Sequence, residues 1–264
     1  MGTTDDIPRR TTEGDATIDR RAFLRTCALA TPVLLGSVVV GGQSAPDEPA
    51  PYDPKDHYYG MAIDVGKCIG CGNCMEACRT ENAVPAPHVR TWVERYTVHE
   101  DDEVTVEAVR EPGERPVPRV AASEAPALRS FFVPKLCNQC ANAPCVQVCP
   151  VGATFTTPDG VTLVDHEYCI GCSYCIQACP YGARFLDPVD HTAQKCTFCY
   201  HRVTRGLAPA CVEVCPTGAR VFGEVGTRNS PLTRFMRFSE IQVLKAHLNT
   251  EPKVYYAGLD GKVV

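Results

Sequence analysis

A run of cysteines between residues 169 and 180 holds the side chains of this sequence that are best suited to metal chemistry. It reads C-I-G-C-S-Y-C-I-Q-A-C-P, so three thiols are spaced two residues apart and a fourth follows after three residues. Thiolate sulfur is a soft ligand that selects transition metals. The first three thiols lie on one tight loop and can face one metal centre, whereas the fourth begins a short helix that leads away. Pro180 then ends the segment, because proline has no backbone N–H to donate. Such a segment needs a partner that supplies its missing ligand.

Three further segments repeat this pattern, and the four together use every cysteine except Cys27. In motif I, Arg79 stands where the proline is expected, so the chain should run on instead of turning back. In motif IV, eleven residues separate the second cysteine from the third. The motifs in chain order are motif I (Cys68, Cys71, Cys74, Cys78), motif II (Cys137, Cys140, Cys145, Cys149), motif III (Cys169, Cys172, Cys175, Cys179) and motif IV (Cys196, Cys199, Cys211, Cys215).

The spacing C-x2-C-x2-C-x3-C-P is typical of 4Fe–4S clusters in bacterial ferredoxins, where the fourth cysteine of a two-cluster protein ligates the other cluster. Sixteen cysteines suffice for four such clusters without any histidine. A disulfide framework does not explain three cysteines crowded on one loop. Zinc is the stronger alternative, because the two separated cysteine pairs of motif IV also suit a structural zinc site. The spacing therefore predicts four 4Fe–4S clusters, with a zinc- or disulfide-stapled interaction module as the alternative of another class.

The composition agrees with a cluster-binding globular domain. A net charge of -5 gives no support to nucleic-acid binding. The 22 prolines and 20 glycines indicate a loop-rich fold with short elements. Metal clusters can replace much of the apolar core in such a fold, because metal binding is coupled to folding.

The pairing of the motifs is a hypothesis of crosswise ligation. Motifs II and III lie close in the sequence and both end in Cys-Pro, like the halves of one ferredoxin, which leaves motifs I and IV to each other. Motifs III and IV are also close, so spacing alone leaves the pairing open. The hypothesis assigns Cys68, Cys71, Cys74 and Cys215 to cluster 1; Cys137, Cys140, Cys145 and Cys179 to cluster 2; Cys169, Cys172, Cys175 and Cys149 to cluster 3; and Cys196, Cys199, Cys211 and Cys78 to cluster 4.

A second repeat follows the fourth cysteine of motifs II, III and IV, where Pro-x-Gly-Ala precedes a short apolar strand. The three glycines (Gly152, Gly182 and Gly218) are expected to let the chain turn back where a Cβ atom would crowd a cluster or a backbone. Such self-similarity indicates duplicated units. The predicted fold class is α+β, with duplicated bacterial-ferredoxin-like (βαβ) units, loop-rich insertions, short strands and short helices. Motifs I and IV form one half of the domain and motifs II and III the other.

The segments around motif I predict the elements that position it. Tyr59 to Val65 is expected to be a strand that leads into the motif. Residues 80–133 contain no cysteine and are predicted to be an insertion. Within it, 91–98 and 104–109 alternate as a strand pair, and 111–128 are rich in Pro, Glu and Ala and predict an exposed loop.

The segment after motif IV predicts two elements. Ser230 and Pro231 suit the N-cap and first position of a helix that runs towards His247. Residues 252–259 are expected to form a final strand. No apolar run near the C-terminus is long enough to span a bilayer.

Three lysines lie next to the cysteine motifs. Lys67 and Lys195 immediately precede motifs I and IV, and Lys135 lies two residues before motif II. Their ammonium groups either raise the potentials of nearby clusters or serve as docking charges. The alternative interpretation is that they are exposed lysines without functional consequence.

Residues 1–45 are predicted to be a twin-arginine signal region. Arg20 and Arg21 are followed by Ala-Phe-Leu-Arg and a moderately apolar run, which resembles an export signal and is too short for a confident membrane span. A Pro-rich linker over 46–57 then separates this region from the cluster-binding domain over 58–264.

Residues 58–260 resemble the four-cluster iron–sulfur beta subunits of molybdopterin oxidoreductases of the dimethyl-sulfoxide-, polysulfide- and tetrathionate-reductase type. The resemblance rests on the four motifs and on the sequences over 165–172, 179–185, 195–199 and 209–213. It looks most like the tetrathionate reductase type, also in the sequence over 254–259. Cysteine stands at all sixteen ligand positions, so four 4Fe–4S clusters are expected and no three-iron cluster. The family pattern also favours the pairing of motifs I with IV and II with III.

The resemblance implies an electron-transfer subunit that is not an enzyme by itself and binds no small-molecule substrate. Its partners would be a molybdopterin-containing catalytic subunit and an integral-membrane, quinol-interacting subunit. Export by the twin-arginine route would place it at the extracytoplasmic, periplasmic face of the cytoplasmic membrane, held there through its partners. Alternative clients of the same clusters are a hydrogenase, a nitrite reductase or a sulfite-oxidising complex.

Overall fold

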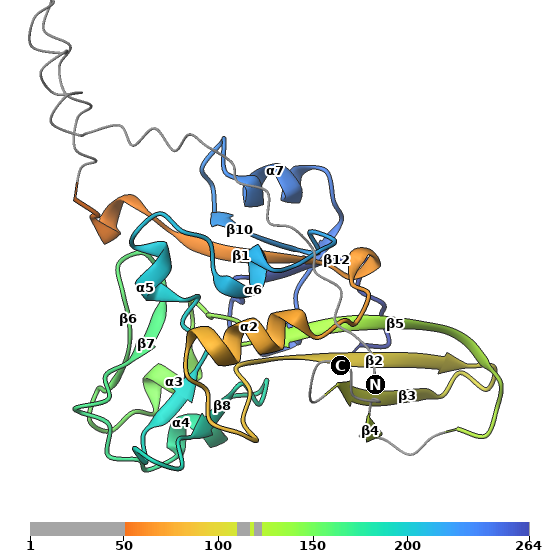
Figure 1. Cartoon of the computed structure of the whole chain (residues 1–264), viewed down its shortest axis with the longest axis horizontal. Helices are drawn as coiled ribbons and strands as arrows, with labels where there is room; N and C mark the ends of the chain where they lie inside the picture. Colours follow the sequence, from red (N-terminus) through yellow and green to blue (C-terminus); the bar gives the residue numbers. More distant parts are fainter. Residues whose placement is uncertain (1–50, 110–116, 119–122, 264) are drawn as a thin grey trace, which may run out of the picture. The chain divides into compact units, whose positions relative to one another are not determined.

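Short strands and short helices dominate the computed structural model, which describes residues 51–109, 117–118 and 123–263 (Figure 1). The strands form two four-stranded sheets and two β-hairpins. Most of the helices are single turns that lie within the cysteine motifs. This combination of small mixed sheets with a few short helices agrees with the predicted α+β class.

The first sheet joins both ends of the described chain, in the strand order β10-β1-β12-β11. Strand β1 (Tyr59–Asp64) pairs antiparallel with β10 (Arg220–Glu224) and parallel with β12 (Val254–Ala257), and β11 (Ile241–Gln242) borders β12. The strands predicted at the two ends of the domain are confirmed. Because motif I follows β1 and motif IV precedes β10, this sheet brings these two motifs together.

The second sheet is built from the insertion between motifs I and II, in the order β4-β3-β2-β5. The predicted strand pair is confirmed as the antiparallel strands β2 (Thr91–His99) and β3 (Val104–Val109). Strands β4 (Val117–Pro118) and β5 (Ala127–Leu136) complete the sheet. The loop prediction is wrong for β4 and for the start of β5, because cross-strand pairing outweighs their loop-like local composition. β5 ends directly at Cys137 and so fixes the position of motif II.

Two hairpins connect the last three motifs. Strands β6 (Thr154–Thr156) and β7 (Thr162–Val164) lead from motif II to motif III, and β8 (Arg184–Leu186) and β9 (Ala193–Lys195) lead from motif III to motif IV. The short strands predicted after the Pro-x-Gly-Ala repeats are confirmed as β6, β8 and β10. Each antiparallel hairpin returns the chain towards the motif that it has just left.

One helix in each motif begins at the residue before the third cysteine. Three of these helices are single turns, whereas the helix of motif I continues for nine residues, because Arg79 replaces the proline that would end it. The four helices are α2 (Asn73–Glu81), α3 (Pro144–Gln147), α4 (Tyr174–Gln177) and α6 (Ala210–Glu213).

Helix α7 (Pro231–Arg237) begins as predicted, with Ser230 at its N-cap. The prediction that it runs towards His247 is wrong, because β11 and the 3-10 helix η3 (Ala246–Leu248) follow it. Residues 241–242 form β11 because they pair with β12. Helix α5 (Tyr200–Val203) occupies the enlarged loop of motif IV. Within the described ranges, no helix is long and apolar enough to cross a membrane.

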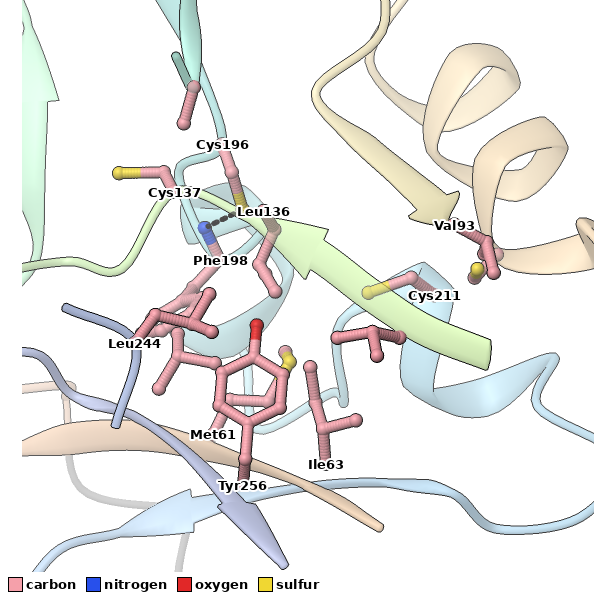
Figure 2. Packing of buried hydrophobic residues seen from close by; sticks show 14 of the residues in the cluster. Met61, Ile63, Val93, Leu136, Cys137, Cys196, Phe198, Cys211, Leu244 and Tyr256 are labelled. Atoms are coloured by element: carbon pink, nitrogen blue, oxygen red, sulfur yellow. Dashed lines mark hydrogen bonds between the residues drawn. The ribbon is translucent and has the colours of Figure 1, made fainter. Parts of the chain in front are cut away.

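The main core links the two sheets and includes several of the cysteines (Figure 2). Tyr256 of β12 is fully buried, and its hydroxyl donates to the carbonyl of Pro134 in β5 at 3.0 Å. Leu136 and Phe198 pack in the same buried group. The cysteines of that group are Cys74, Cys137, Cys196 and Cys211. The sulfur sites are therefore part of the interior.

Residues 1–50, which contain the predicted signal region and the start of the predicted linker, lie outside the described residues. The rest of the linker contacts the folded body. Tyr52 stacks on His57 with 4.8 Å between ring centroids and donates a hydrogen bond to Asp159. His57 Nδ1 lies 2.6 Å from Glu224 Oε1. These contacts tie the linker end to the β6–β7 turn and to β10.

Candidate iron–sulfur centres

Three cavities are each lined by three cysteines of one motif and the fourth cysteine of another. The structure thereby brings together the quartets that the crosswise hypothesis assigns to clusters 1, 2 and 4. Cavity 1, of about 350 Å³, is lined by Cys68, Cys71, Cys74 and Cys215; cavity 2, of about 340 Å³, by Cys137, Cys140, Cys145 and Cys179; and cavity 4, of about 300 Å³, by Cys196, Cys199, Cys211 and Cys78.

The three cavities are nearly equal in volume although the gap between the second and third cysteines differs. This gap is two residues in motif I, four in motif II and eleven in motif IV. The extra residues of motif IV form α5 and the turn after it instead of widening the cavity. The longer gap of motif IV therefore leaves its cavity no larger than the other two.

Backbone contacts join the segments that carry the cysteines of the fourth predicted quartet. Asp165 N–H donates to Ala153 O at 2.7 Å, which joins the start of motif III to the turn after Cys149. Cys169 N–H in turn donates to Asp165 O at 3.1 Å. Cys175 is buried in one apolar group with cysteines of motif II. These contacts hold motif III against the turn that carries Cys149, as a cluster 3 site requires.

The residue before the second cysteine is left-handed in all four motifs. It is glycine in motifs I and III, where Gly70 has φ +71° and Gly171 has φ +68°. In motifs II and IV it is Gln139 (φ 46°) and Phe198 (φ 53°), although this conformation costs a side-chain-bearing residue about 1–2 kcal/mol. Both are fully buried, and Gln139 Nε2 donates to Cys196 O at 2.7 Å. The sequence analysis missed this shared position, which only the glycines of motifs I and III indicate.

The Pro-x-Gly-Ala turns direct backbone N–H groups at sulfur. Gly152, Gly182 and Gly218 all have φ between 62° and 68°, and a Cβ atom added to any of them would meet no protein atom within 4 Å. Glycine is thus required for its backbone conformation and not for space among the protein atoms. Although burial raises the pKa of Cys149 and of Cys215, several N–H donors of the following turn outweigh it and lower both values. Such donors stabilise a bound thiolate.

Most of the other cysteine thiols are buried in low dielectric surroundings. Burial and neighbouring cysteines raise the pKa of Cys68 and Cys211 to about 11, and that of Cys78 and Cys140 to about 12. Without a metal these thiols are therefore protonated near neutral pH. A metal centre that binds them as thiolates must displace the protons.

Cysteine is the metal-ligating residue type that lines the three cavities. In the part of the chain that the structure describes, no three His, Cys, Asp or Glu side chains are arranged to hold a single metal ion. Tetrahedral zinc requires four ligands about 2.0–2.3 Å from one centre. None of the 16 described cysteines forms a disulfide. Each of the three cavities presents four cysteine thiols, which is the donor set of a 4Fe–4S cluster.

Buried hydrogen-bond donors without a protein partner line two of the cavities. In the described residues, Asn138 Nδ2 and Arg184 Nε are buried and unpaired, and both residues line cavity 2. Arg90 Nε is likewise unpaired, and Arg90 lines cavity 4. Buried donors are rarely left unsatisfied. A bound cluster would offer acceptor sulfurs to these donors, whereas Asn138 Oδ1, which is also buried and unpaired, is an acceptor that sulfur cannot satisfy.

Two buried arginines donate hydrogen bonds to cysteine sulfur. Arg220 Nη2 lies 3.3 Å from Cys74 Sγ, and Nη1 lies 3.6 Å from Cys211 Sγ. Arg184 Nη2 lies 3.0 Å from Cys145 Sγ. Although burial opposes it, the facing cysteine sulfurs, when ionised, raise the pKa of both guanidinium groups. The sequence analysis missed this role, although both residues follow Gly-Ala in the repeat.

The three lysines near the motifs differ in exposure. The Lys67 side chain is 56% exposed and lies 3.3 Å from Asp64. Lys195 is fully buried, and its ammonium group donates to Cys196 O at 2.7 Å. Lys135 is also buried and lies 2.7 Å from Glu94 Oε2. The expected exposure is therefore confirmed for Lys67 and wrong for Lys135 and Lys195.

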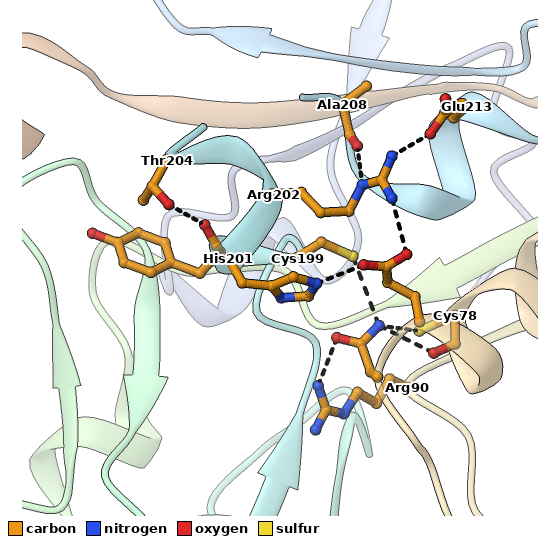
Figure 3. A network of polar contacts seen from close by, with 11 residues as sticks. Cys78, Arg90, Cys199, His201, Arg202, Thr204, Ala208 and Glu213 are labelled. Carbon is orange, nitrogen blue, oxygen red and sulfur yellow. Dashed lines mark hydrogen bonds and ion pairs between the residues drawn. The ribbon is translucent and has the colours of Figure 1, made fainter. Parts of the chain in front are cut away.

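A polar network fastens the end of α2 to motif IV (Figure 3). Asn82 Nδ2 donates to Cys78 O at 3.0 Å and lies 3.6–3.7 Å from the sulfurs of Cys78 and Cys199. Glu81 accepts hydrogen bonds from His201 and Arg202, whose proximity lowers its pKa. The longer α2 thus delivers the fourth cysteine of motif I to cavity 4.

Two family models match the chain, and both describe 4Fe–4S proteins. A 4Fe-4S dicluster domain matches residues 128–225, which contain motifs II, III and IV. A 4Fe-4S binding domain matches residues 61–82, which contain motif I. All four motifs therefore fall within 4Fe–4S domains.

Three relatives share most of their length with this chain. The B subunit of tetrathionate reductase from Salmonella typhimurium is 40% identical over 240 residues, which cover 87% of each protein. The corresponding B subunit from Archaeoglobus fulgidus is 45% identical over 203 residues, 77% of this chain and 83% of that one. The B component of polysulfide reductase from Wolinella succinogenes is 37% identical over 200 residues, 75% of this chain and 92% of that one. The chain therefore belongs to the family of iron–sulfur electron-transfer subunits of reductase complexes, which bind 4Fe–4S clusters and are not catalytic by themselves.

Proposed function

We propose that the chain conducts electrons through four 4Fe–4S clusters that are ligated crosswise between motifs I and IV and between motifs II and III. The observation that carries this proposal is the set of cavities that combine three cysteines of one motif with the fourth of another. Bound clusters would supply one-electron redox chemistry. The duplicated ferredoxin-like (βαβ) arrangement, with motifs I and IV in one half and II and III in the other, belongs to the same proposal.

The order of the clusters would be 1, 4, 2 and 3. Arg220 contacts cysteines of clusters 1 and 4. Gln139 of motif II donates to Cys196 of motif IV, which supports clusters 2 and 4 as neighbours. At the two ends, Cys71 of cluster 1 and Cys172 of cluster 3 are exposed. Electrons would therefore enter and leave through clusters 1 and 3.

The partners would be a molybdopterin-containing catalytic subunit and an integral-membrane subunit that interacts with quinol. Relatives named as parts of tetrathionate and polysulfide reductases support a reductase of sulfur compounds as the client. The chain itself would hold no organic substrate and break no bond. Co-purification of the complex with intact partners, followed by identification of the large subunit, tests this assignment. A hydrogenase or nitrite-reductase subunit in its place would overturn the choice of client.

Export by the twin-arginine route would deliver the chain to the periplasmic face already folded. Arg20 and Arg21 carry this part of the proposal. Such transport would protect sixteen thiols from oxidation, because the clusters would be inserted before export. Replacing both arginines with lysine should retain the protein in the cytoplasm, as cell fractionation would report. Unchanged export of the double variant would refute the route.

The cluster content can be measured on the full chain after anaerobic purification. Four clusters predict about 16 iron atoms per chain and the visible absorption of 4Fe–4S proteins. Crosswise ligation predicts that Cys215→Ser and Cys71→Ser perturb the same electron paramagnetic resonance signal, whereas Cys179→Ser perturbs another. A colourless chain that contains zinc would refute the electron-transfer function.

A further inference from the structure

Arg184 and Arg220 occupy the same place in two of the repeats. Each follows Cys-Pro-x-Gly-Ala and is the first residue of the strand that returns from a motif, β8 or β10. Only 6% of the surface of Arg184 and 3% of that of Arg220 is exposed. Burying a charged guanidinium is costly unless opposite charge compensates it. Cysteine sulfurs accept hydrogen bonds from both guanidinium groups.

Each arginine lies between the two quartets of one half of the domain. Arg220 donates to Cys74 of the cluster 1 quartet and to Cys211 of the cluster 4 quartet. Arg184 donates to Cys145 of the cluster 2 quartet, and Cys145 packs in one buried group with Cys175 of the cluster 3 quartet. The internal repeat has therefore produced two equivalent sites with one fixed positive charge between two sulfur sites.

A charge in this position acts on electron transfer through electrostatics. A cluster held by four thiolates is anionic and becomes more negative when it accepts an electron. A nearby cation stabilises the reduced form and raises the reduction potential, with little screening in a buried site. Because arginine stays protonated at all accessible pH values, its contribution does not depend on titration.

We propose that Arg184 and Arg220 are positioning residues for electron transfer, each of which raises the reduction potentials of the two clusters between which it lies. Each also reduces the electrostatic repulsion between two anionic neighbouring clusters. This inference rests on the cluster ligation proposed above.

A hydroxyl group orients each guanidinium. Arg220 Nη2 donates to Thr91 Oγ1 at 2.7 Å, and Arg184 Nη1 lies 3.3 Å from Thr154 Oγ1. A purely structural role predicts that loss of the arginine lowers cluster content or stability without moving potentials. An electrostatic role predicts shifted potentials in clusters that remain fully loaded, and partial rescue by lysine, which retains the charge.

The test is a redox titration of the full, anaerobically purified chain, monitored by electron paramagnetic resonance and accompanied by iron analysis. Arg220→Gln should lower the potentials of two of the four clusters, so that their oxidised-to-reduced ratio at a fixed potential rises about tenfold, or ~59 mV. Arg184→Gln should lower the other two by a similar amount. Lysine variants at both positions should restore most of each shift. Arg95→Gln is the control, because Arg95 pairs with Glu107 on the second sheet.

Unchanged potentials in fully loaded glutamine variants, or equal shifts in all four clusters, would overturn the inference. If a glutamine variant loses iron, Thr91→Val and Thr154→Val provide the second test, since each removes only the orienting hydroxyl. They should shift the same pair of clusters by a smaller amount, and no shift in either would also overturn the inference. A wild-type chain with fewer than four cluster signals would instead refute the proposed ligation.

Discussion

Motifs II and IV, the inner motifs, and motifs I and III, the outer motifs, share one loop geometry but differ in burial. The second cysteine is buried in the inner motifs, at Cys140 and Cys199, and exposed in the outer ones, at Cys71 and Cys172. The order proposed for the clusters places the inner motifs at the centre of the electron path. The buried inner motifs would thus pass electrons within the chain, and the exposed outer motifs would exchange electrons with partner proteins.

The left-handed residue of each loop shows how one backbone shape serves both settings. In the outer motifs it is glycine, and a Cβ added there would lie 2.5 Å from the Phe132 ring at Gly70 or 2.4 Å from His191 O at Gly171. In the inner motifs Gln139 and Phe198 adopt the same conformation and fill the interior with their side chains. All four motifs require a left-handed residue before the second cysteine. The surroundings of each loop determine whether that residue carries a side chain.

The largest effect on this comparison is expected from Phe198→Ala. Removing a fully buried phenylalanine should lower the free energy of unfolding by about 3–5 kcal/mol and loosen the inner loop. Urea denaturation and iron content of the anaerobic protein measure both effects. Phe238, which is 86% exposed, supplies the control, because Phe238→Ala should change stability by no more than about 0.5 kcal/mol. Equal effects of the two variants would contradict the inner role of Phe198.

An outer loop can be tested through Gly171→Ala. Alanine would have to keep the positive φ of this position, and its Cβ would also clash with His191 O. We therefore expect the free energy of unfolding to fall by about 2 kcal/mol and the cluster 3 signal to weaken. Gly182→Ala measures the cost of the positive φ alone, because no protein atom lies within 4 Å of its added Cβ. The free energy of unfolding should fall by about 1 kcal/mol. A larger loss for Gly182→Ala than for Gly171→Ala would show that crowding does not select the outer glycines.

The raised thiol pKa values predict how iron retention depends on pH. A thiol that leaves a cluster takes up a proton at any pH below its own pKa, which is about 12 for Cys140 and about 11 for Cys211. Retention against a chelator should therefore weaken as pH falls, by about tenfold per pH unit and per released thiol, throughout pH 6 to 10. The iron that remains bound at equilibrium with the chelator, corrected for the chelator's own protonation, measures this slope. A plateau above pH 8.5, where an ordinary thiol ionises, would contradict the prediction.

The smallest effect concerns oxidants. Cys71 and Cys172 are exposed, so a small oxidant should reach clusters 1 and 3 more easily than clusters 2 and 4. The signals of clusters 1 and 3 should therefore disappear several-fold faster. This ratio corresponds to about 1 kcal/mol in activation free energy. Time-resolved electron paramagnetic resonance after exposure to limited oxygen follows each signal. Simultaneous decay of all four would mean that burial does not separate inner from outer clusters.

Local spacing was sufficient to group sixteen cysteines into four motifs, because ligand geometry restricts the sequence over a few residues. It left open which motifs share a cavity, because that depends on how segments distant in the sequence pack together. The strand pair at β2 and β3 was also predictable, since alternation is a local signal. Strand β5 and the end of α7 were not, because their structure depends on pairing with strands distant in the sequence.

The roles of Arg184 and Arg220 were also beyond sequence patterns. An arginine that starts a short strand is usually exposed, and only the surrounding sulfur atoms make its burial tolerable. The left-handed Gln139 and Phe198 give no local signal either, because these residue types avoid that conformation.

The first sheet has a consequence for the order of events during synthesis. Its central strand β1 precedes every cysteine motif, whereas its neighbours β10 and β12 follow all of them. A ribosome therefore releases all sixteen cysteines before β1 can acquire both partners. Closing so long a loop costs little more entropy than closing a shorter one, since the cost grows only with the logarithm of length. The late pairing of β1 therefore costs time more than free energy. During that time the nascent thiols depend on a reducing cytoplasm.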